Sequence, residues 1–192
     1  MKSIINNNEY ELIVKNSRFI SLIYKFKDGE DLNKILDEVK EKYPKATHYT
    51  YAYITESSKK SSDDGEPGGT AGTPILNVLE KEELINVLVI IVRYFGGIKL
   101  GAGGLVRAYS KACSNVIDKD NLIELVNGYL IKIEFNYDQE KDINYKLKDY
   151  EVINKEYTDR IIYEVLIPKD DIDILSNLTY EIIDEKLIRK QD

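Results

Sequence analysis

Glycine is distributed very unevenly along this chain. Nine of its 11 glycines lie between Gly65 and Gly104, and the two others are Gly29 and Gly128. Glycine permits backbone conformations that other residues cannot adopt, so this stretch is expected to contain closely shaped loops. The two glycine clusters flank a helical turn and a strongly apolar strand, which indicates a shaped surface rather than a flexible linker.

The second glycine cluster is predicted to join a central strand over residues 86–95 to a helix over 104–118. Unpaired N–H groups at a helix start carry partial positive charge, so they favour anions such as phosphate. The alternative is a tight strand-to-helix turn that needs glycine for its geometry alone. Neither the Walker pattern nor the dinucleotide fingerprint is present. The residues predicted to bind an anion or nucleic acid are Arg93, Tyr94, Gly96, Gly97, Lys99, Gly101, Gly103, Gly104, Arg107 and Tyr109.

The first glycine cluster lies in a polar loop predicted over residues 57–73. Its three carboxylates could hold Mg²⁺, cap a helix or remain solvated in a turn. Thr73 is favoured as the cap of a short helix over residues 74–81. The only histidine, His48, is either a general base or a hydrogen-bonded strand residue. The residues of this second candidate loop, with the histidine, are Asp63, Asp64, Gly65, Glu66, Gly69, Thr70, Gly72 and His48. Neither a metal ion nor a cofactor is predicted.

Hydrophobic periodicity predicts an α+β protein with two domains. In residues 1–126 it predicts strands at 9–14, 18–26, 48–55 and 86–95, and helices at 31–43, 74–81 and 104–118. In residues 127–192 it predicts the β-α-β-β-α-β order of a ferredoxin-like domain: strands at 129–135, 151–157, 160–168 and 180–187, and helices at 139–150 and 170–178. The boundary is expected at 126–128, where Gly128 would supply a turn.

Charge and composition narrow the possible functions. The net charge of −7 argues against non-specific binding of polyanions by the whole surface, yet no acidic residue lies between Leu84 and Ile117. No apolar run approaches the ~18 residues of a membrane span. The single cysteine, Cys113, allows neither an internal disulfide nor a cysteine-rich zinc site, and it is expected to be packed within its helix. A cytoplasmic protein without a membrane partner is expected.

The two glycine motifs together resemble the IMPACT/YigZ family. The matching runs are SDDGEP at 62–67, GTAG at 69–72, RYFGG at 93–97, KLG at 99–101 and GGLVRAY at 103–109, with SRF at 17–19 and ATH at 46–48. The resemblance implies a two-layer α/β N-terminal domain like domain 2 of ribosomal protein S5. It also implies a C-terminal ferredoxin-like domain similar to domain V of elongation factor G. Thr73 departs from the basic residue that many members carry there, which removes a positive charge beside the candidate groove.

Three classes of function remain open. The resemblance favours a non-enzymatic regulatory protein linked to translation, with RNA, the ribosome or a protein of the translation machinery as its partner. Eukaryotic members regulate translation by competing for the activator of a starvation-sensing kinase. The alternatives are an enzyme or binder acting on a phosphorylated small molecule or nucleotide, and a protein–protein adaptor. The residue spacing reveals no catalytic nucleophile–base pair. Tyr94, Phe95 and Tyr109 flank the basic loop and are candidates for base stacking, although tyrosine is also a common half-buried strand residue.

Overall fold

A computed structural model describes residues 1–190, and the chain divides into two compact units. The first unit is Met1–Ile123, and the second begins at Glu124. Each unit combines an antiparallel sheet with helices, which agrees with the predicted α+β class. Over the described residues, no helix is both long and apolar enough to cross a membrane.

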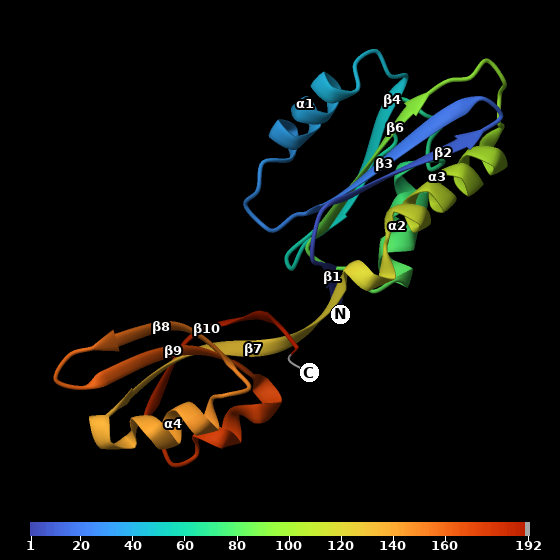
Figure 1. Cartoon of the computed structure of the whole chain (residues 1–192). Helices are drawn as coiled ribbons and strands as arrows, with labels where there is room; N and C mark the ends of the chain where they lie inside the picture. Colours follow the sequence, from blue (N-terminus) through green and yellow to red (C-terminus); the bar gives the residue numbers. More distant parts are fainter. Residues whose placement is uncertain (191–192) are drawn as a thin grey trace. The chain divides into compact units, whose positions relative to one another are not determined.

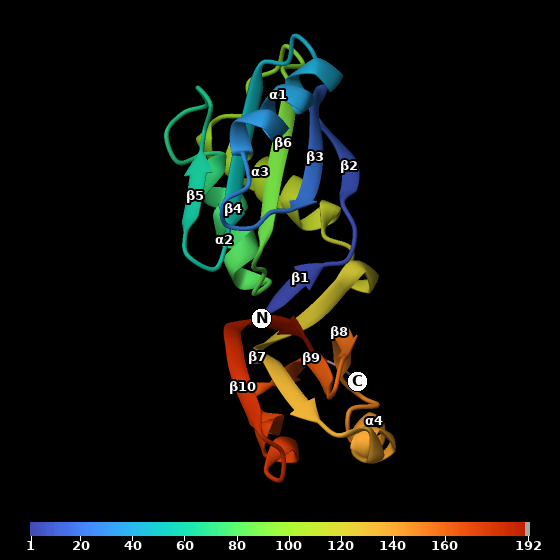
Figure 2. The ribbon, with the colours of Figure 1, turned by 90° about the vertical axis from the view of Figure 1, so that its left-hand side faces the viewer.

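The first unit is built on a five-stranded sheet in the order β2-β3-β6-β4-β5, seen strand by strand in Figure 2. All neighbouring pairs in this sheet are antiparallel. The elements of the first unit are β1 (Lys2–Ile4), β2 (Asn8–Val14), β3 (Ser17–Lys25), α1 (Leu32–Lys42), β4 (His48–Ile54), β5 (Lys59–Ser62), α2 (Gly72–Lys81), β6 (Val87–Tyr94), α3 (Ala102–Val116) and the 3-10 turn η1 (Lys119–Asn121).

The central strand β6 is buried from Val87 to Arg93, because helices cover both faces of the sheet (Figure 1). Val87, Val89 and Ile91 pack in the core beneath α2 and α3. The alternate residues of β6 pack in a second core with Val39 of α1. Period-two alternation on a strand explains this division. The helix α1 therefore adds a third layer to the two that the family resemblance implies.

The hairpin β2–β3 brings its turn against the second glycine loop. Lys15 and Asn16 both have positive φ angles, 46° and 62°, as a two-residue hairpin turn requires. The Gly96 N–H donates to Ser17 Oγ at 3.1 Å. A Cβ on Gly96 would lie 2.0 Å from the carbonyl carbon of Asn16, so only glycine fits here. The strand end, the hairpin and the glycine loop are thus packed as one block.

Several elements of the first unit differ from the prediction. β5 lies inside the predicted 57–73 loop and pairs with β4, so this part of the loop forms an edge strand. Its sequence, Lys-Lys-Ser-Ser, carries no apolar alternation that would reveal it. The helices α2 and α3 each begin two residues before their predicted starts, at Gly72 and Ala102. Each helix has a glycine in its first two residues, and because glycine lowers helix propensity, the sequence pattern predicts both starts too late.

The second unit has the strand order β10-β7-β9-β8, again antiparallel at each pair. Its core contains Phe135 and Tyr163, whose rings meet edge to face with centroids 4.9 Å apart. The predicted helix over 170–178 is a 3-10 segment that ends at Leu175. The elements are β7 (Leu122–Phe135), η2 (Tyr137–Gln139), α4 (Glu140–Lys146), β8 (Glu151–Tyr157), β9 (Ile161–Pro168), η3 (Lys169–Leu175) and β10 (Tyr180–Arg189).

The turn predicted at Gly128 is wrong. Gly128 lies inside β7 and is paired with Lys186 of β10 and Pro168 of β9. A Cβ on Gly128 would lie 2.4 Å from Ile188 Cδ1 and 2.9 Å from the Ile167 carbonyl oxygen. The glycine therefore serves close packing in a continuous strand, with no change of chain direction.

The packing of Gly96 predicts a large difference between two glycine-to-alanine variants. Gly96→Ala should lower the free energy of unfolding by about 1–3 kcal/mol or more, because the new methyl group overlaps backbone atoms of the hairpin. Gly68→Ala should be nearly neutral, since nothing lies within 4 Å of its Cβ position. Urea unfolding of both variants measures this. Equal stabilities of the two variants would show that the hairpin backbone does not exclude a Cβ atom at position 96.

Candidate functional site

A buried ion pair joins the two glycine loops. Arg93, near the end of β6, donates from Nη1 to Oε1 of Glu66 at 2.5 Å. Their side chains are only 6% and 3% exposed. A buried charge is costly unless a partner of opposite charge and hydrogen bonds compensate it. The pair therefore fixes the loop around Glu66 to the end of the central strand.

Two further side chains surround the Glu66 carboxylate. The Tyr109 hydroxyl of α3 donates to the same Oε1 atom at 2.7 Å. Burial, and then the Glu66 carboxylate, raise the pKa of the Tyr109 phenol well above its usual value, so this hydroxyl remains a donor. His48 Nε2 lies 3.8 Å from Oε2. His48 Nδ1 lies 2.7 Å from the Asp64 carbonyl oxygen, which can only accept, so Nδ1 carries a proton.

Asp63 holds the rest of the first loop in place through hydrogen bonds to backbone N–H groups. Its carboxylate accepts from the N–H groups of Gly69, Ala71 and Gly72 at 2.8, 3.0 and 2.8 Å. Burial alone would raise the pKa of Asp63, but these three donors outweigh it and lower the pKa below its usual value. The bonds to Ala71 and Gly72 satisfy donors at the start of α2. The predicted cap by Thr73 is wrong, because Thr73 lies inside an already started helix and is exposed.

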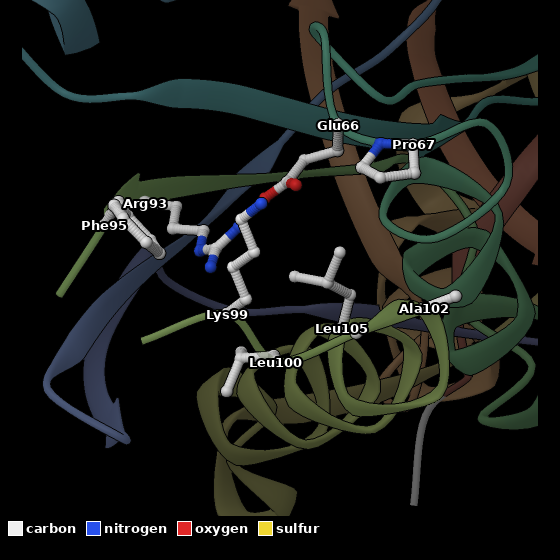
Figure 3. A pocket seen from close by; sticks show the side chains of 9 residues that line it. Glu66, Pro67, Arg93, Phe95, Lys99, Leu100, Ala102 and Leu105 are labelled. Atoms are coloured by element: carbon white, nitrogen blue, oxygen red, sulfur yellow. The ribbon is translucent and has the colours of Figure 1, made fainter. Parts of the chain in front are cut away.

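The two glycine loops line one pocket of about 350 Å³ (Figure 3). Figure 3 shows the Glu66 carboxylate and the Arg93 guanidinium directed toward each other in its wall. Apolar side chains supply most of the remaining lining. The lining residues are Glu66, Pro67, Arg93, Phe95, Lys99, Leu100, Gly101, Ala102 and Leu105.

The N-terminus of α3 forms one wall of this pocket. Gly101 precedes the helix with φ 72° and ψ 164°, a conformation open only to glycine. No side chain among residues 1–190 caps α3. The N–H of Leu105 bonds to Gly101 O, and the N–H groups before it have no helical acceptor. Partial positive charge is therefore available where Gly101 and Ala102 line the pocket.

The predicted cations do not all lie in the pocket. Arg93 and Lys99 line it, the first buried and the second exposed. Arg107 is outside the lining, but its Nη1 atom lies 3.5 Å from the position a Cβ on Gly103 would take. The Arg107 guanidinium thus lies over the first turn of α3, next to the pocket wall.

Two of the three aromatic candidates, Tyr94 and Tyr109, are placed differently from the prediction. Tyr109 is fully buried, so its ring cannot stack on a ligand. The Tyr94 hydroxyl donates to the Pro44 carbonyl oxygen, and the ring packs in the core on the α1 side of the sheet. Phe95, which flanks the basic loop, is 46% exposed and lines the pocket with Arg93. Of the three aromatic residues that the sequence offers as stacking candidates, Phe95 is the one that lines this pocket.

The predicted glycines have different roles. Gly101 lines the pocket, whereas a Cβ on Gly72 would lie 2.7 Å from the Ser62 nitrogen, so Gly72 is required for packing like Gly96. The others lie outside the pocket lining, in the loops or the first turn of α3: Gly65, Gly69, Gly97, Gly103 and Gly104. Thr70 is buried, and its hydroxyl donates to the Pro67 carbonyl oxygen at 2.6 Å.

The three carboxylates of the first loop have separate protein partners. Asp63 accepts from backbone N–H groups, Asp64 Oδ2 accepts from the Tyr49 N–H at 2.6 Å, and Glu66 pairs with Arg93. In the described part of the chain, no three His, Cys, Asp or Glu side chains are grouped so that they could hold a metal ion.

The buried pair predicts that two substitutions at the Glu66 carboxylate cluster differ in their effect on stability. Glu66→Ala should lower the free energy of unfolding by about 3–5 kcal/mol, because it leaves the Arg93 charge buried without a counter-charge. Tyr109→Phe should cost less, about 1.5–3 kcal/mol, because it removes one hydrogen bond to a charged group while Glu66 keeps its bond to Arg93. Denaturant unfolding compares the two variants. A loss below about 1 kcal/mol for Glu66→Ala would contradict this role of the pair.

The lowered pKa of Asp63 predicts a pH-dependent stability difference. The ionised carboxylate stabilises the fold above its unfolded-state pKa of about 3.9, and this contribution is lost as the pH falls through the lower folded-state pKa. The stability gap between the parent chain and Asp63→Asn should therefore narrow from about pH 6 to about pH 3. Urea midpoints across this range measure the gap, and a gap that stays constant would refute the prediction.

Comparison with known proteins gives one consistent result. Residues 15–117 match the family profile described as the Impact N-terminal domain. The chain is 31% identical to "IMPACT family member YvyE" of Bacillus subtilis, over 93% of this chain and 84% of that protein. It is 30% identical to "IMPACT family member YigZ" of Escherichia coli, over 81% and 79% of the two chains. A solved structure, "Crystal structure of an hypothetical protein", superposes with a TM-score of 0.62 at 26% identity, covering 96% of this chain and 98% of the other. The profile and the near full-length relatives show that the chain belongs to the IMPACT family.

Proposed function

We propose that this protein is a non-enzymatic regulator of translation that binds single-stranded RNA through its first unit. The link to translation rests on family membership, and it would place the protein in the cytoplasm. The main observation in support of RNA binding is that both glycine loops line one pocket at the uncapped N-terminus of α3. Phosphate groups are held at such sites by backbone N–H groups and nearby cations.

The topology supports a more detailed assignment of the two folds. The order β2-β3-β6-β4-β5 with α2 and α3 on one face fits a fold like domain 2 of ribosomal protein S5, extended by α1. The order β10-β7-β9-β8 fits a ferredoxin-like domain. On this proposal the two compact units are two domains, and the nucleic-acid site belongs to the first.

A row of exposed cations continues from the pocket along α3. Lys99 lies at the pocket, and Arg107 and Lys111 follow on the helix. Residues four apart lie on one helix face, about 6 Å apart along the axis. The absence of acidic residues between Leu84 and Ile117 leaves this row without nearby negative charge in sequence. A row of this kind suits successive phosphates better than one isolated anion.

The salt dependence of RNA binding tests this function. Three neutralised phosphates on a single strand predict that log affinity falls against log salt with a slope of roughly −2. Arg107→Ala should reduce the magnitude of this slope by about 0.7, because one phosphate contact is lost. Lys34→Ala, an exposed lysine on α1, should leave the slope unchanged. Fluorescence anisotropy with a labelled single-stranded RNA measures all three slopes.

A flat salt response would contradict electrostatic binding of RNA. Equal slopes for Arg107→Ala and Lys34→Ala would contradict the placement of the site on α3.

A further inference from the structure

We infer that the pocket is a subsite for one nucleotide of single-stranded RNA, with the base stacked on Phe95 and one phosphodiester at Lys99 and the start of α3. This inference rests on the proposed function and specifies its ligand. The pocket is at the small end of the roughly 300–1,000 Å³ range of ligand pockets, which suits a single nucleotide.

The charges of the pocket favour an anion with a single charge. Among the lining residues, Arg93 and Lys99 are cationic and Glu66 is anionic, which leaves a net charge of +1. The Glu66 carboxylate already accepts hydrogen bonds from Arg93 and Tyr109 in the pocket wall. A phosphodiester carries one negative charge and matches this balance. A terminal phosphate with two charges would be repelled by Glu66.

Arg93 has donor capacity that the described residues do not use. Its Nε atom is buried without a hydrogen-bond partner, and its bond to Glu66 uses only Nη1. Only 6% of the side chain is exposed, yet it forms part of the pocket wall. Unsatisfied donors on a buried charged group are unfavourable. Because Nε itself is buried, an acceptor on a ligand would bind the part of the guanidinium that lies in the pocket wall.

Phe95 provides the stacking surface. It is 46% exposed at the pocket, and the Arg93 guanidinium lies 5.7 Å from its ring centroid. Its backbone is held, because the Phe95 N–H donates to Thr47 Oγ1 at 3.0 Å and the next N–H to Ser17 Oγ at 3.1 Å. An exposed aromatic ring beside a cation is a common base-stacking site in proteins that bind single strands.

A peptide carboxylate would also satisfy the charge balance. Two features favour a nucleotide: the half-exposed ring at the cation, and the continuation of exposed cations to Arg107 and Lys111. The exposed cations Arg107 and Lys111 provide sites for neighbouring phosphates, which the end of a peptide would leave unused.

Two matched variants and two matched RNAs test the inference. Phe95→Ala should weaken binding of a single-stranded RNA by about tenfold or more, because base stacking is lost. It should change the affinity for an abasic strand of equal length and phosphate number by less than about twofold, and Phe95→Tyr should restore RNA binding. Ile98→Ala is the control, because Ile98 is equally exposed at 46% and lies in the same loop outside the pocket lining.

The outcomes separate this inference from the proposed function. If the parent chain binds RNA with the expected salt slope but Phe95→Ala equals Ile98→Ala, the function stands and the nucleotide subsite is wrong. The same conclusion follows if Phe95→Ala weakens the abasic strand as much as the RNA, or if a peptide ending in a free carboxylate displaces the RNA from the pocket. If the parent chain binds no RNA, both proposals are wrong.

Discussion

The first unit depends on one buried ion pair. Arg93 and Glu66 come from segments 27 positions apart in sequence, and each needs the other because neither charge is solvated. Their bond places the first glycine loop beside the end of β6, where the second glycine loop begins. The pocket exists because of this contact, and its lining contains both partners. On the proposed function, structural and binding roles are combined in the same two side chains.

Short polar side chains hold the loops in place around the pair. Asp63 binds three N–H groups of its own loop, while Thr47 and Ser17 each bind one N–H of the second loop. Each bond satisfies a backbone donor that glycine-rich loops leave without a regular secondary-structure partner. The loops are thus ordered by contacts within the protein, and on the proposed function this order lowers the entropy cost of binding.

Local patterns predicted much of this fold, and long-range contacts account for the errors. The strands β2, β3 and β6 lie within one residue of their predicted bounds, because the pattern of apolar residues is a local signal. Arg93, Lys99 and Gly101 were predicted for one site and do line one pocket, because a strand, a loop and a helix follow directly in sequence. Tyr109 faces the core instead, since the rotation of α3 about its axis depends on packing against β3 and β6. The contact between Gly128 and Ile188 joins distant parts of the chain and leaves no local signal, so the sequence predicts a turn at this glycine instead.

The contact between Gly96 and the hairpin turn has a consequence for sequence change in this protein. The turn at Lys15 and Asn16 is far from the pocket in sequence, yet its backbone is the surface on which the loop after β6 rests. An inserted or deleted residue in that turn would move the support of the Phe95 loop, even though no pocket residue had been altered. On the proposed function, the length of the hairpin is constrained by ligand recognition as well as by strand pairing.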